Sequence, residues 1–323
     1  MLDRLGREID YVRISITDRC NLRCVYCMPE HGVASMRHED VLSYEEILRT
    51  VRALAALGIH HVRVTGGEPM ARLHCLTLIE RLHAIEGIES VSMTTNGLLL
   101  DGRVAWAKEA GLSAINVSLD TLNPETYRKM TRGGDVFRVL AVIHEAMTLG
   151  LHVKVNAVPV RGMNDDDLTA LAMLAKEHPI CVRFIELMPV GCGAALAPIS
   201  TDEVRANLQA ALGPLQPDEQ RHGFGPARYV RPEGFVGSIG FISPMSHEFC
   251  GSCNRVRLTA DGFLKLCLNH SAGLDVRALL RSGASDDELQ ETLAGAIAAK
   301  PARHGFGEAV DDREARRMNE IGG

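Results

Sequence analysis

Three cysteines lie within eight residues near the start of the chain, at Cys20, Cys24 and Cys27. Thiolates this close can converge on one metal centre with little loop to order. One site that fits this spacing is a zinc ion, which needs a fourth ligand that His31 could supply. The other is an iron–sulfur cluster held by three cysteines, which leaves one iron open for chemistry.

A second group of three cysteines lies far along the chain, at Cys250, Cys253 and Cys267. His270 follows the last of them at the spacing of a zinc ribbon, so zinc is one interpretation of this group. A second three-cysteine cluster is the other. In both groups the identity of a fourth ligand stays open.

The remaining cysteines do not form a third group. Cys75, in a predicted helix, and Cys181, in a predicted strand, have the pattern of buried thiols. Cys192 lies between glycines on a loop, and we expect it not to bind metal. Nine cysteines without a predicted export signal fit a reducing cytosol and metal ligation better than a disulfide framework. We therefore expect a cytoplasmic protein.

Composition excludes two classes of partner. The net charge is −6 and aromatic residues make up 4% of the chain, so neither a basic field nor a stacking platform is available for nucleic acid. No apolar run approaches the length of a membrane span. We expect no nucleic acid and no membrane among the partners of this globular protein.

Six predicted strands alternate with predicted helices over the first part of the chain. The strands cover residues 11–17, 62–65, 91–95, 114–118, 153–159 and 181–187. This alternation predicts an α/β fold with a parallel sheet and right-handed crossovers. Six units are too few for a closed eightfold barrel, so we expect an open, partial (β/α)6 TIM-like barrel. A capping box of Ser43 and Glu46 predicts the start of the first helix.

The unusual residues follow the carboxyl ends of these strands. The cysteine loop follows the first strand, and Gly66-Gly67-Glu68-Pro69 follows the second. Glycines let the backbone approach a ligand closely, although a simple tight turn is the alternative. The carboxyl ends of parallel strands form the functional face of such sheets and barrels, so we expect the active site there.

The texture of the sequence changes after about residue 213. Glycine and proline become frequent between residues 214 and 244, and short strands replace long helices. We therefore expect a partial barrel in residues 1–213 and a C-terminal domain in residues 214–323 that carries the second cysteine group. Two amphipathic helices are predicted within residues 274–300, and the chain ends in Gly322-Gly323.

The first cysteine group, with Tyr26 before its third cysteine and with the Gly66–Pro69 motif, resembles the radical S-adenosylmethionine superfamily. Within it, the second cysteine group, the stretch Asn254-Arg255-Val256-Arg257 and the terminal glycines resemble the GTP 3′,8-cyclase family, which opens molybdenum-cofactor biosynthesis. The resemblance covers residues 13–323.

The resemblance implies that the first cysteine group binds a [4Fe–4S] cluster whose open iron chelates S-adenosylmethionine. An electron from the cluster would cleave the sulfonium and give a 5′-deoxyadenosyl radical. The residues that match the family's contacts with this cofactor are Tyr26, Gly67, Ser118 and Met188.

The second cysteine group would hold another [4Fe–4S] cluster, whose open iron binds the guanine of GTP. The radical would take hydrogen from the ribose 3′ carbon, and that carbon would attack guanine C8 to form (8S)-3′,8-cyclo-7,8-dihydroguanosine 5′-triphosphate. The residues at the family's GTP contacts are Arg13, Arg63, Thr94, Lys154, Arg255, Val256 and Arg257. Arg13, Gly322 and Gly323 are the implied catalytic positions.

The charges of the predicted strands agree with an anionic substrate. Arg13 and Arg63 lie where the alternation would place an apolar or small side chain inward, and an arginine inside a barrel needs an anionic partner. A solvated face or an ion pair within the protein is the alternative for each arginine. The family requires neither His31 nor His270, so we expect neither to bind metal.

Two other functions stay open at this stage. One is a radical S-adenosylmethionine enzyme that modifies a peptide with the help of an auxiliary cluster, and the other is a zinc-stabilised binding module. For the cyclase, the implied partners are a reductant protein and the downstream cyclic pyranopterin monophosphate synthase. We expect a monomer or a homodimer.

Overall fold

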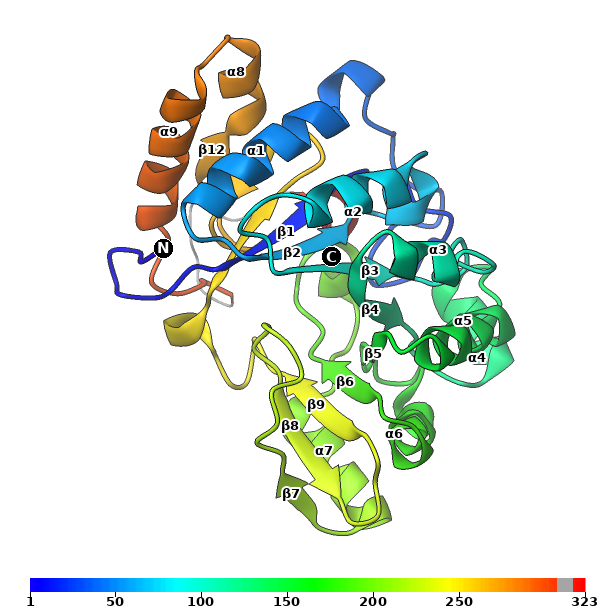
Figure 1. Cartoon of the computed structure of the whole chain (residues 1–323). Helices are drawn as coiled ribbons and strands as arrows, with labels where there is room; N and C mark the ends of the chain where they lie inside the picture. Colours follow the sequence, from blue (N-terminus) through cyan, green and yellow to red (C-terminus); the bar gives the residue numbers. More distant parts are fainter. Residues whose placement is uncertain (307–315, 323) are drawn as a thin grey trace.

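The fold is taken from a computed structural model that describes residues 1–306 and 316–322. Six parallel strands lie side by side in chain order (Figure 1). They are β1 (Tyr11–Ser15), β2 (His61–Thr65), β3 (Ser90–Thr95), β4 (Leu112–Ser118), β5 (His152–Ala157) and β6 (Cys181–Ile185). The helices between them are α1 (Tyr44–Ala56), α2 (Cys75–His83), α3 (Val104–Glu109), α4 (Pro124–Thr131), α5 (Val136–Thr148) and α6 (Leu168–Glu177). The predicted open, partial α/β barrel is confirmed.

Three predicted strands extend two residues beyond the observed carboxyl ends, in β1, β5 and β6. The apolar pattern continues past the last strand residue because loop residues such as Ile16 and Leu187 are themselves buried. The residues that follow these strands therefore belong to the loops of the functional face.

Strands from the C-terminal part extend the sheet at both edges. After α7 (Thr201–Leu212), β9 (Ser238–Ile242) pairs in parallel with β6, and β10 (Arg255–Leu258) pairs in parallel with β1. The outer strands are β8 (Arg228–Pro232) and β7 (Leu215–Pro217) at one edge, and β11 (Phe263–Lys265) and β12 (Gly273–Asp275) at the other. The resulting 12-stranded sheet continues across residue 213, the boundary predicted between two domains.

Three helices follow the last strands. They are α8 (Val276–Arg281), α9 (Asp286–Ala298) and α10 (Met318–Ile321). The predicted capping box at the start of α1 is confirmed, because Glu46 N donates to Ser43 Oγ at 3.1 Å and Ser43 N donates to Glu46 Oε2 at 2.7 Å. Such a cap satisfies two backbone donors that the helix itself leaves unpaired.

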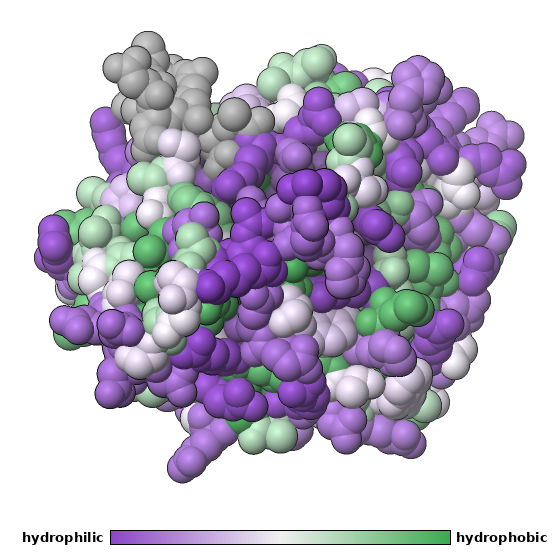
Figure 2. All heavy atoms as spheres, turned by 90° about the horizontal axis from the view of Figure 1, so that it is seen from above, coloured by the Kyte–Doolittle hydropathy of each residue, from purple (hydrophilic) through white to green (hydrophobic). Residues whose placement is uncertain are grey.

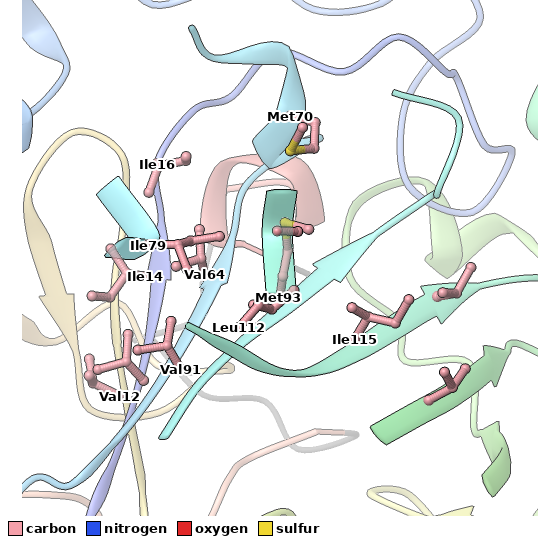
Figure 3. Close-up of a cluster of buried hydrophobic side chains, with 14 of the residues drawn as sticks. Val12, Ile14, Ile16, Val64, Met70, Ile79, Val91, Met93, Leu112 and Ile115 are labelled. Atoms are coloured by element: carbon pink, nitrogen blue, oxygen red, sulfur yellow. The ribbon is translucent and has the colours of Figure 1, made fainter. Parts of the chain in front are cut away.

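Alternation along β1 separates the core from the site. Val12 and Ile14 are fully buried in the hydrophobic cluster shown in Figure 3, together with Val64 and Met93 from neighbouring strands. Successive strand residues point to opposite faces of a sheet. Arg13 therefore points to the other face, away from the cluster.

The surface is mainly polar. Figure 2 shows hydrophilic residues over most of one face, with hydrophobic residues scattered between them. Within residues 1–306 and 316–322, no helix combines the length and apolar character needed to cross a bilayer.

A candidate active site between two cysteine groups

All six cysteines of the two groups line a single cavity of about 300 Å³ at the carboxyl ends of the strands. The first group lies on the loop after β1. The second lies just before β10 and after β11. Because β10 pairs with β1, two segments more than two hundred residues apart in sequence meet across this cavity.

The sulfurs of the first group face hydrogen-bond donors. Leu22 N donates to Cys20 Sγ at 3.4 Å, and Asn96 Nδ2 donates to the same sulfur at 3.8 Å. Burial, followed by the neighbouring Cys20 and Cys192, raises the pKa of Cys27 to about 12. Burial raises the pKa of Cys24 as well. These thiols are therefore neutral in the free protein and need a bound cation to become thiolates.

The glycine motif supports the cysteine loop. A Cβ on Gly66 would lie 2.6 Å from Thr17 O, and one on Gly67 would lie 2.4 Å from Arg19 O. Backbone contact this close leaves no room for a side chain. Gly67 N donates to Thr17 O at 2.7 Å, so the two strand-end loops are joined directly. Both glycines also line the cavity.

Glu68 lies behind the cavity and is fully buried. Its carboxylate accepts hydrogen bonds from Thr95 Oγ1 at 2.8 Å, Asn96 N at 2.8 Å and Met70 N at 3.1 Å. Burial raises the pKa of Glu68 to about 7. The carboxylate therefore joins the glycine motif to the end of β3.

The second cysteine group has a cationic environment. Burial by itself would raise the pKa of Cys253, but Arg255 and Lys300 outweigh burial and lower that pKa to about 7. Arg7 holds the surrounding backbone, because its guanidinium donates to Cys250 O at 3.0 Å and to Pro301 O at 2.8 Å. Cys253 thus favours the thiolate even without a metal, whereas burial raises the pKa of Cys250.

Spacing of the sulfurs argues against a single zinc ion in either group. Among the described residues, one set of three potential ligands has all its ligand atoms within 4.8 Å of one another, and it is Glu248, Cys250 and His304. Zinc-bound sulfurs would lie ~3.8 Å apart, given tetrahedral bonds of about 2.3 Å. The cysteine groups are wider than that, as a larger iron–sulfur cluster requires.

His304 is not free to complete a zinc site. Its Nε2 lies 2.8 Å from Pro244 O, which can only accept, so this nitrogen carries the proton. Its Nδ1 accepts from Phe306 N at 3.3 Å. His270 Nε2 lies 3.1 Å from Arg303 O, and neither His31 nor His270 lines the cavity. His304 and His270 therefore have other hydrogen-bond partners.

Three arginines from neighbouring strands form a row along one side of the cavity. Arg13 of β1 lies in register with Arg257 of β10 and with Arg63 of β2. Burial, followed by repulsion from Arg257 and Arg63, lowers the pKa of Arg13 well below its usual value. Glu186 is the one carboxylate among the described lining residues, and Thr201 N and Met245 N already donate to it. The cavity is therefore built for an anion.

Comparison with known proteins identifies the family. The chain matches the model of the Radical SAM superfamily over residues 14–175 and the model described as Molybdenum Cofactor Synthesis C over residues 180–306. It is 48% identical to the GTP 3′,8-cyclase of Pelotomaculum thermopropionicum, 46% to that of Moorella thermoacetica and 42% to that of Clostridium perfringens strain 13, each alignment covering 100% of both chains.

The chain belongs to the GTP 3′,8-cyclase family of radical S-adenosylmethionine enzymes. The resemblance expected from the motifs is confirmed. Membership implies S-adenosylmethionine and a [4Fe–4S] cluster.

A solved structure agrees on the fold. Streptococcus suis SuiB bound to S-adenosylmethionine superposes with a TM-score of 0.62 at 14% identity, covering 89% of this chain and 68% of that one. SuiB bound to its precursor peptide SuiA gives a TM-score of 0.63 at the same identity, covering 91% of this chain and 67% of that one. At this identity the likeness between SuiB and this chain concerns the fold alone.

In this member of the cyclase family, all four residues predicted to contact S-adenosylmethionine line the cavity. They are Tyr26, Gly67, Ser118 and Met188. The Tyr26 hydroxyl donates to Asp120 Oδ2 at 2.8 Å, and burial raises the pKa of Asp120 to about 6. Asp120 therefore holds the Tyr26 ring in place through its hydroxyl group.

Most of the predicted GTP contacts also converge there. The lining residues among them are Arg13, Arg63, Thr94, Arg255 and Arg257. The Thr94 hydroxyl is buried and has no hydrogen-bond partner within residues 1–306 and 316–322, so a ligand group can satisfy it. The residues present thus fit both small molecules.

Two predicted GTP contacts lie apart from the cavity wall. Lys154 is buried, and a Cβ on Gly223 would come within 2.8 Å of its Nζ. The Val256 side chain is fully buried in the hydrophobic cluster, so it can reach a ligand through its backbone alone.

Gly322 is placed at the site, and Gly323 lies outside the described residues. Arg257 Nη1 donates to Gly322 O at 3.2 Å. Gly322 has a φ of 81°, and a Cβ there would come within 2.9 Å of Ser15 Cβ. The position therefore favours glycine on both grounds.

Sequence reasoning missed Arg183, Lys300 and Asn319, which also line the cavity. Arg183 donates to Asn156 Oδ1 at 2.8 Å, also on the cavity wall. The signal for Arg183 was available, because it interrupts the apolar pattern of β6 as Arg63 interrupts that of β2. No local pattern marks Lys300 or Asn319.

Proposed function

We propose that this chain converts GTP into (8S)-3′,8-cyclo-7,8-dihydroguanosine 5′-triphosphate, the first step of molybdenum-cofactor biosynthesis. The observation that carries the proposal is one cavity with a three-cysteine group at each side and a row of arginines between them. A binding module would need neither the arginines nor the spacing of the sulfurs.

Cys20, Cys24 and Cys27 would hold the [4Fe–4S] cluster that the superfamily implies, and Cys250, Cys253 and Cys267 would hold a second one. Together with S-adenosylmethionine, a reduced cluster supplies the electron and the radical chemistry when bound. The chain's part is to keep the two small molecules in one orientation and water outside.

The residues divide between the two small molecules by position. Tyr26, Gly67, Ser118 and Met188, beside the first group, would hold S-adenosylmethionine. Near the second group and along the strands, the residues for GTP would be Arg13, Arg63, Thr94, Lys154, Arg255, Val256 and Arg257. The arginine row would receive the triphosphate. Only one carboxylate, that of Glu186, is present among the described lining residues to balance the positive charges of the row. Guanine is then directed to the second group.

Gly322 would close the cavity between β1 and β2, and we assign Arg13, Gly322 and Gly323 to the catalytic machinery. Support comes from the hydrogen bond of Arg257 to Gly322 O at 3.2 Å. The backbone of the tail can lie where a side chain would clash with Ser15.

The proposal extends to partners of stated kinds. A reductant protein must supply electrons, and a cyclic pyranopterin monophosphate synthase would take the product. The protein would act in the cytoplasm, because free thiols need the reducing conditions found there. It would act as a monomer or a homodimer.

Product analysis tests the function. Reconstituted protein is incubated under anaerobic conditions with dithionite, S-adenosylmethionine and GTP, and the products are separated by chromatography. We expect 5′-deoxyadenosine and a cyclic nucleotide in equal amounts, with about eight irons per chain. A colourless protein with two zinc ions would indicate the binding module. Formation of 5′-deoxyadenosine that does not depend on GTP, with no cyclic nucleotide, would indicate a different radical enzyme.

A further inference from the structure

The C-terminal helix α10 brings one side chain to the first cysteine group. Asn319, its second residue, lines the cavity and is 1% exposed. Its backbone N–H donates to the sulfur of Cys27. The end of the chain therefore contacts a proposed cluster ligand directly.

The orientation of the Asn319 amide follows from its partner. Asn319 Nδ2 donates to Asp18 O at 3.4 Å. A backbone carbonyl can only accept, so the nitrogen must face Asp18 and the oxygen must face the other way. That oxygen, Oδ1, is buried and has no hydrogen-bond partner anywhere in residues 1–306 and 316–322.

A buried acceptor without a partner is rare and costly, so Oδ1 calls for a donor that the described chain does not supply. The position of Asp18 indicates which ligand brings it. Asp18 O lies 2.7 Å from the place a Cβ on Gly67 would take, so Asn319 stands beside the glycine motif and the first cysteine group. The small molecule proposed for that side is S-adenosylmethionine, which carries an ammonium group, two ribose hydroxyls and an adenine amino group as donors.

We propose that Asn319 is a positioning residue for S-adenosylmethionine, whose N–H or O–H donor it accepts at Oδ1 while its backbone N–H holds Cys27. This inference rests on the proposed function, because it takes S-adenosylmethionine as the ligand at the first group. Asn319 touches the cofactor and the cysteine loop, and it takes no part in bond breaking.

Helix α10 also carries the C-terminal Gly322, so binding of S-adenosylmethionine and docking of the chain end in the cavity are linked. Ile321 is 1% exposed, and Gly322 O accepts from Arg257 at the far side of the cavity. A cofactor that binds Asn319 therefore favours the seated helix, and the seated helix favours the cofactor by the same factor. Tail seating and S-adenosylmethionine binding are thermodynamically coupled.

Equilibrium dialysis of radiolabelled S-adenosylmethionine against the reconstituted full-length protein measures the contact. Asn319→Leu keeps the backbone N–H to Cys27 and a similar shape but removes both polar side-chain groups. We expect its affinity for S-adenosylmethionine to fall about tenfold, the effect of one buried hydrogen bond lost. Glu320→Gln, on the same helix but not among the residues that line the cavity, is the matched control and keeps its affinity. A parallel dialysis with GTP alone is expected to show no change.

The outcomes separate this inference from the proposed function. If the unmodified protein binds no S-adenosylmethionine, the proposed function fails. If it binds and Asn319→Leu binds equally well, or if only the GTP affinity falls, Asn319 does not contact the cofactor. As a spectroscopic readout, S-adenosylmethionine should change the paramagnetic resonance of the reduced protein less in Asn319→Leu than in the unmodified protein.

A second measurement needs no variant. Carboxypeptidase removes residues from an accessible chain end, so the reconstituted protein is digested with and without saturating S-adenosylmethionine, and release of the last residues is followed by mass spectrometry. We expect S-adenosylmethionine to slow release about tenfold, in keeping with the coupling. An equal rate in both samples would overturn the link between the tail and the cofactor.

Discussion

The two cysteine groups have the same number of cysteines, and their charged neighbours differ. Around the first, burial raises the pKa of Cys24 and Cys27, and the negative Asp120 adds to that effect on Cys24. Around the second, Arg255 and Lys300 lower the pKa of Cys253 to about 7. The first group therefore depends on its metal for charge balance, whereas Cys253 of the second has cations beside it before metal arrives, although burial raises the pKa of Cys250.

The difference matches the two proposed ligands. S-adenosylmethionine is itself a sulfonium cation, so the side that receives it has no need of further cations. GTP is an anion, and the cationic side can bind it next to thiolates without a large repulsion. The electrostatics of each group therefore suit the small molecule assigned to it.

The largest expected effect separates the two groups by reaction. Cys24→Ser should abolish both 5′-deoxyadenosine and cyclic nucleotide, because the first group carries the cleavage of S-adenosylmethionine. Cys253→Ser should lose the cyclic nucleotide by at least about a thousandfold while still forming some 5′-deoxyadenosine. Chromatography of both products and iron analysis, with loss of about four irons in each variant, check this. Equal loss of both products in the two variants would remove the proposed division of labour.

Thiol reactivity in the metal-free protein sharpens the comparison. At about pH 7.5, most of Cys253 is thiolate and almost none of Cys27 is, given pKa values of about 7 and about 12. Iodoacetamide should therefore modify Cys253 at least about a hundredfold faster, as read by peptide mass spectrometry over time. Lys300→Gln should slow the reaction of Cys253 and leave that of Cys27 unchanged. Faster modification of Cys27 would reverse the assigned electrostatics.

A single cation on the GTP side should have a smaller effect. Arg63→Met removes one charge from the row and should weaken GTP binding about tenfold to a hundredfold, with S-adenosylmethionine binding unchanged. Equilibrium dialysis with each compound measures this. Arg228→Met, at an exposed position of β8, is the control. A matching loss for S-adenosylmethionine would show that the two sides are not separate.

The smallest expected effect is the uptake of a proton by Lys154 when GTP binds. Burial, followed by Arg183 and Arg63, lowers the pKa of Lys154 to about 7, with Cys181 acting weakly in the opposite direction. At about pH 8.5 the free protein therefore holds Lys154 neutral, and a bound triphosphate would restore its charge. The part of the proton uptake that depends on Lys154 should be close to about one proton at that pH and almost none near about pH 6, where Lys154 is already charged.

Titration calorimetry in two buffers of different ionisation enthalpy measures that proton. Lys154→Met should abolish the pH-dependent uptake. The same depressed pKa means that the unfolded chain binds more protons than the folded one between about pH 7 and the ordinary value of 10.5. The contribution of Lys154 to stability therefore rises with pH across that range and is least favourable below it.

The sequence predicts the first half of the site well. Parallel strands in chain order place their carboxyl ends at one edge, so the cysteine loop and the glycine motif had to meet. The close contacts of Gly66 and Gly67 with the backbone of Thr17 and Arg19 are local consequences of that order. Membership of the radical S-adenosylmethionine superfamily was predicted from these features, and the open barrel was predicted from the alternation of strands and helices. Both predictions are confirmed.

The second half depends on pairing between distant segments. No periodicity states that β10 lies beside β1, and that pairing alone puts Arg257 in register with Arg13. Asn319 is harder still, because a four-residue helix has no periodic signal and its partner, Asp18, is three hundred residues away. Such contacts follow from the tertiary structure and have no signature in a short window of sequence.

The two outer flanks of the sheet have a consequence for biosynthesis. A nascent chain that has emerged as far as β6 presents β1 and β6 as bare edges, because the segments that cover both arrive only in the last third of translation. Bare edges invite pairing with other chains. The same final stretch of polypeptide covers both bare edges and completes the site that would take up iron. Protection from aggregation on the ribosome and assembly of the complete centre therefore both require that this stretch has been synthesised.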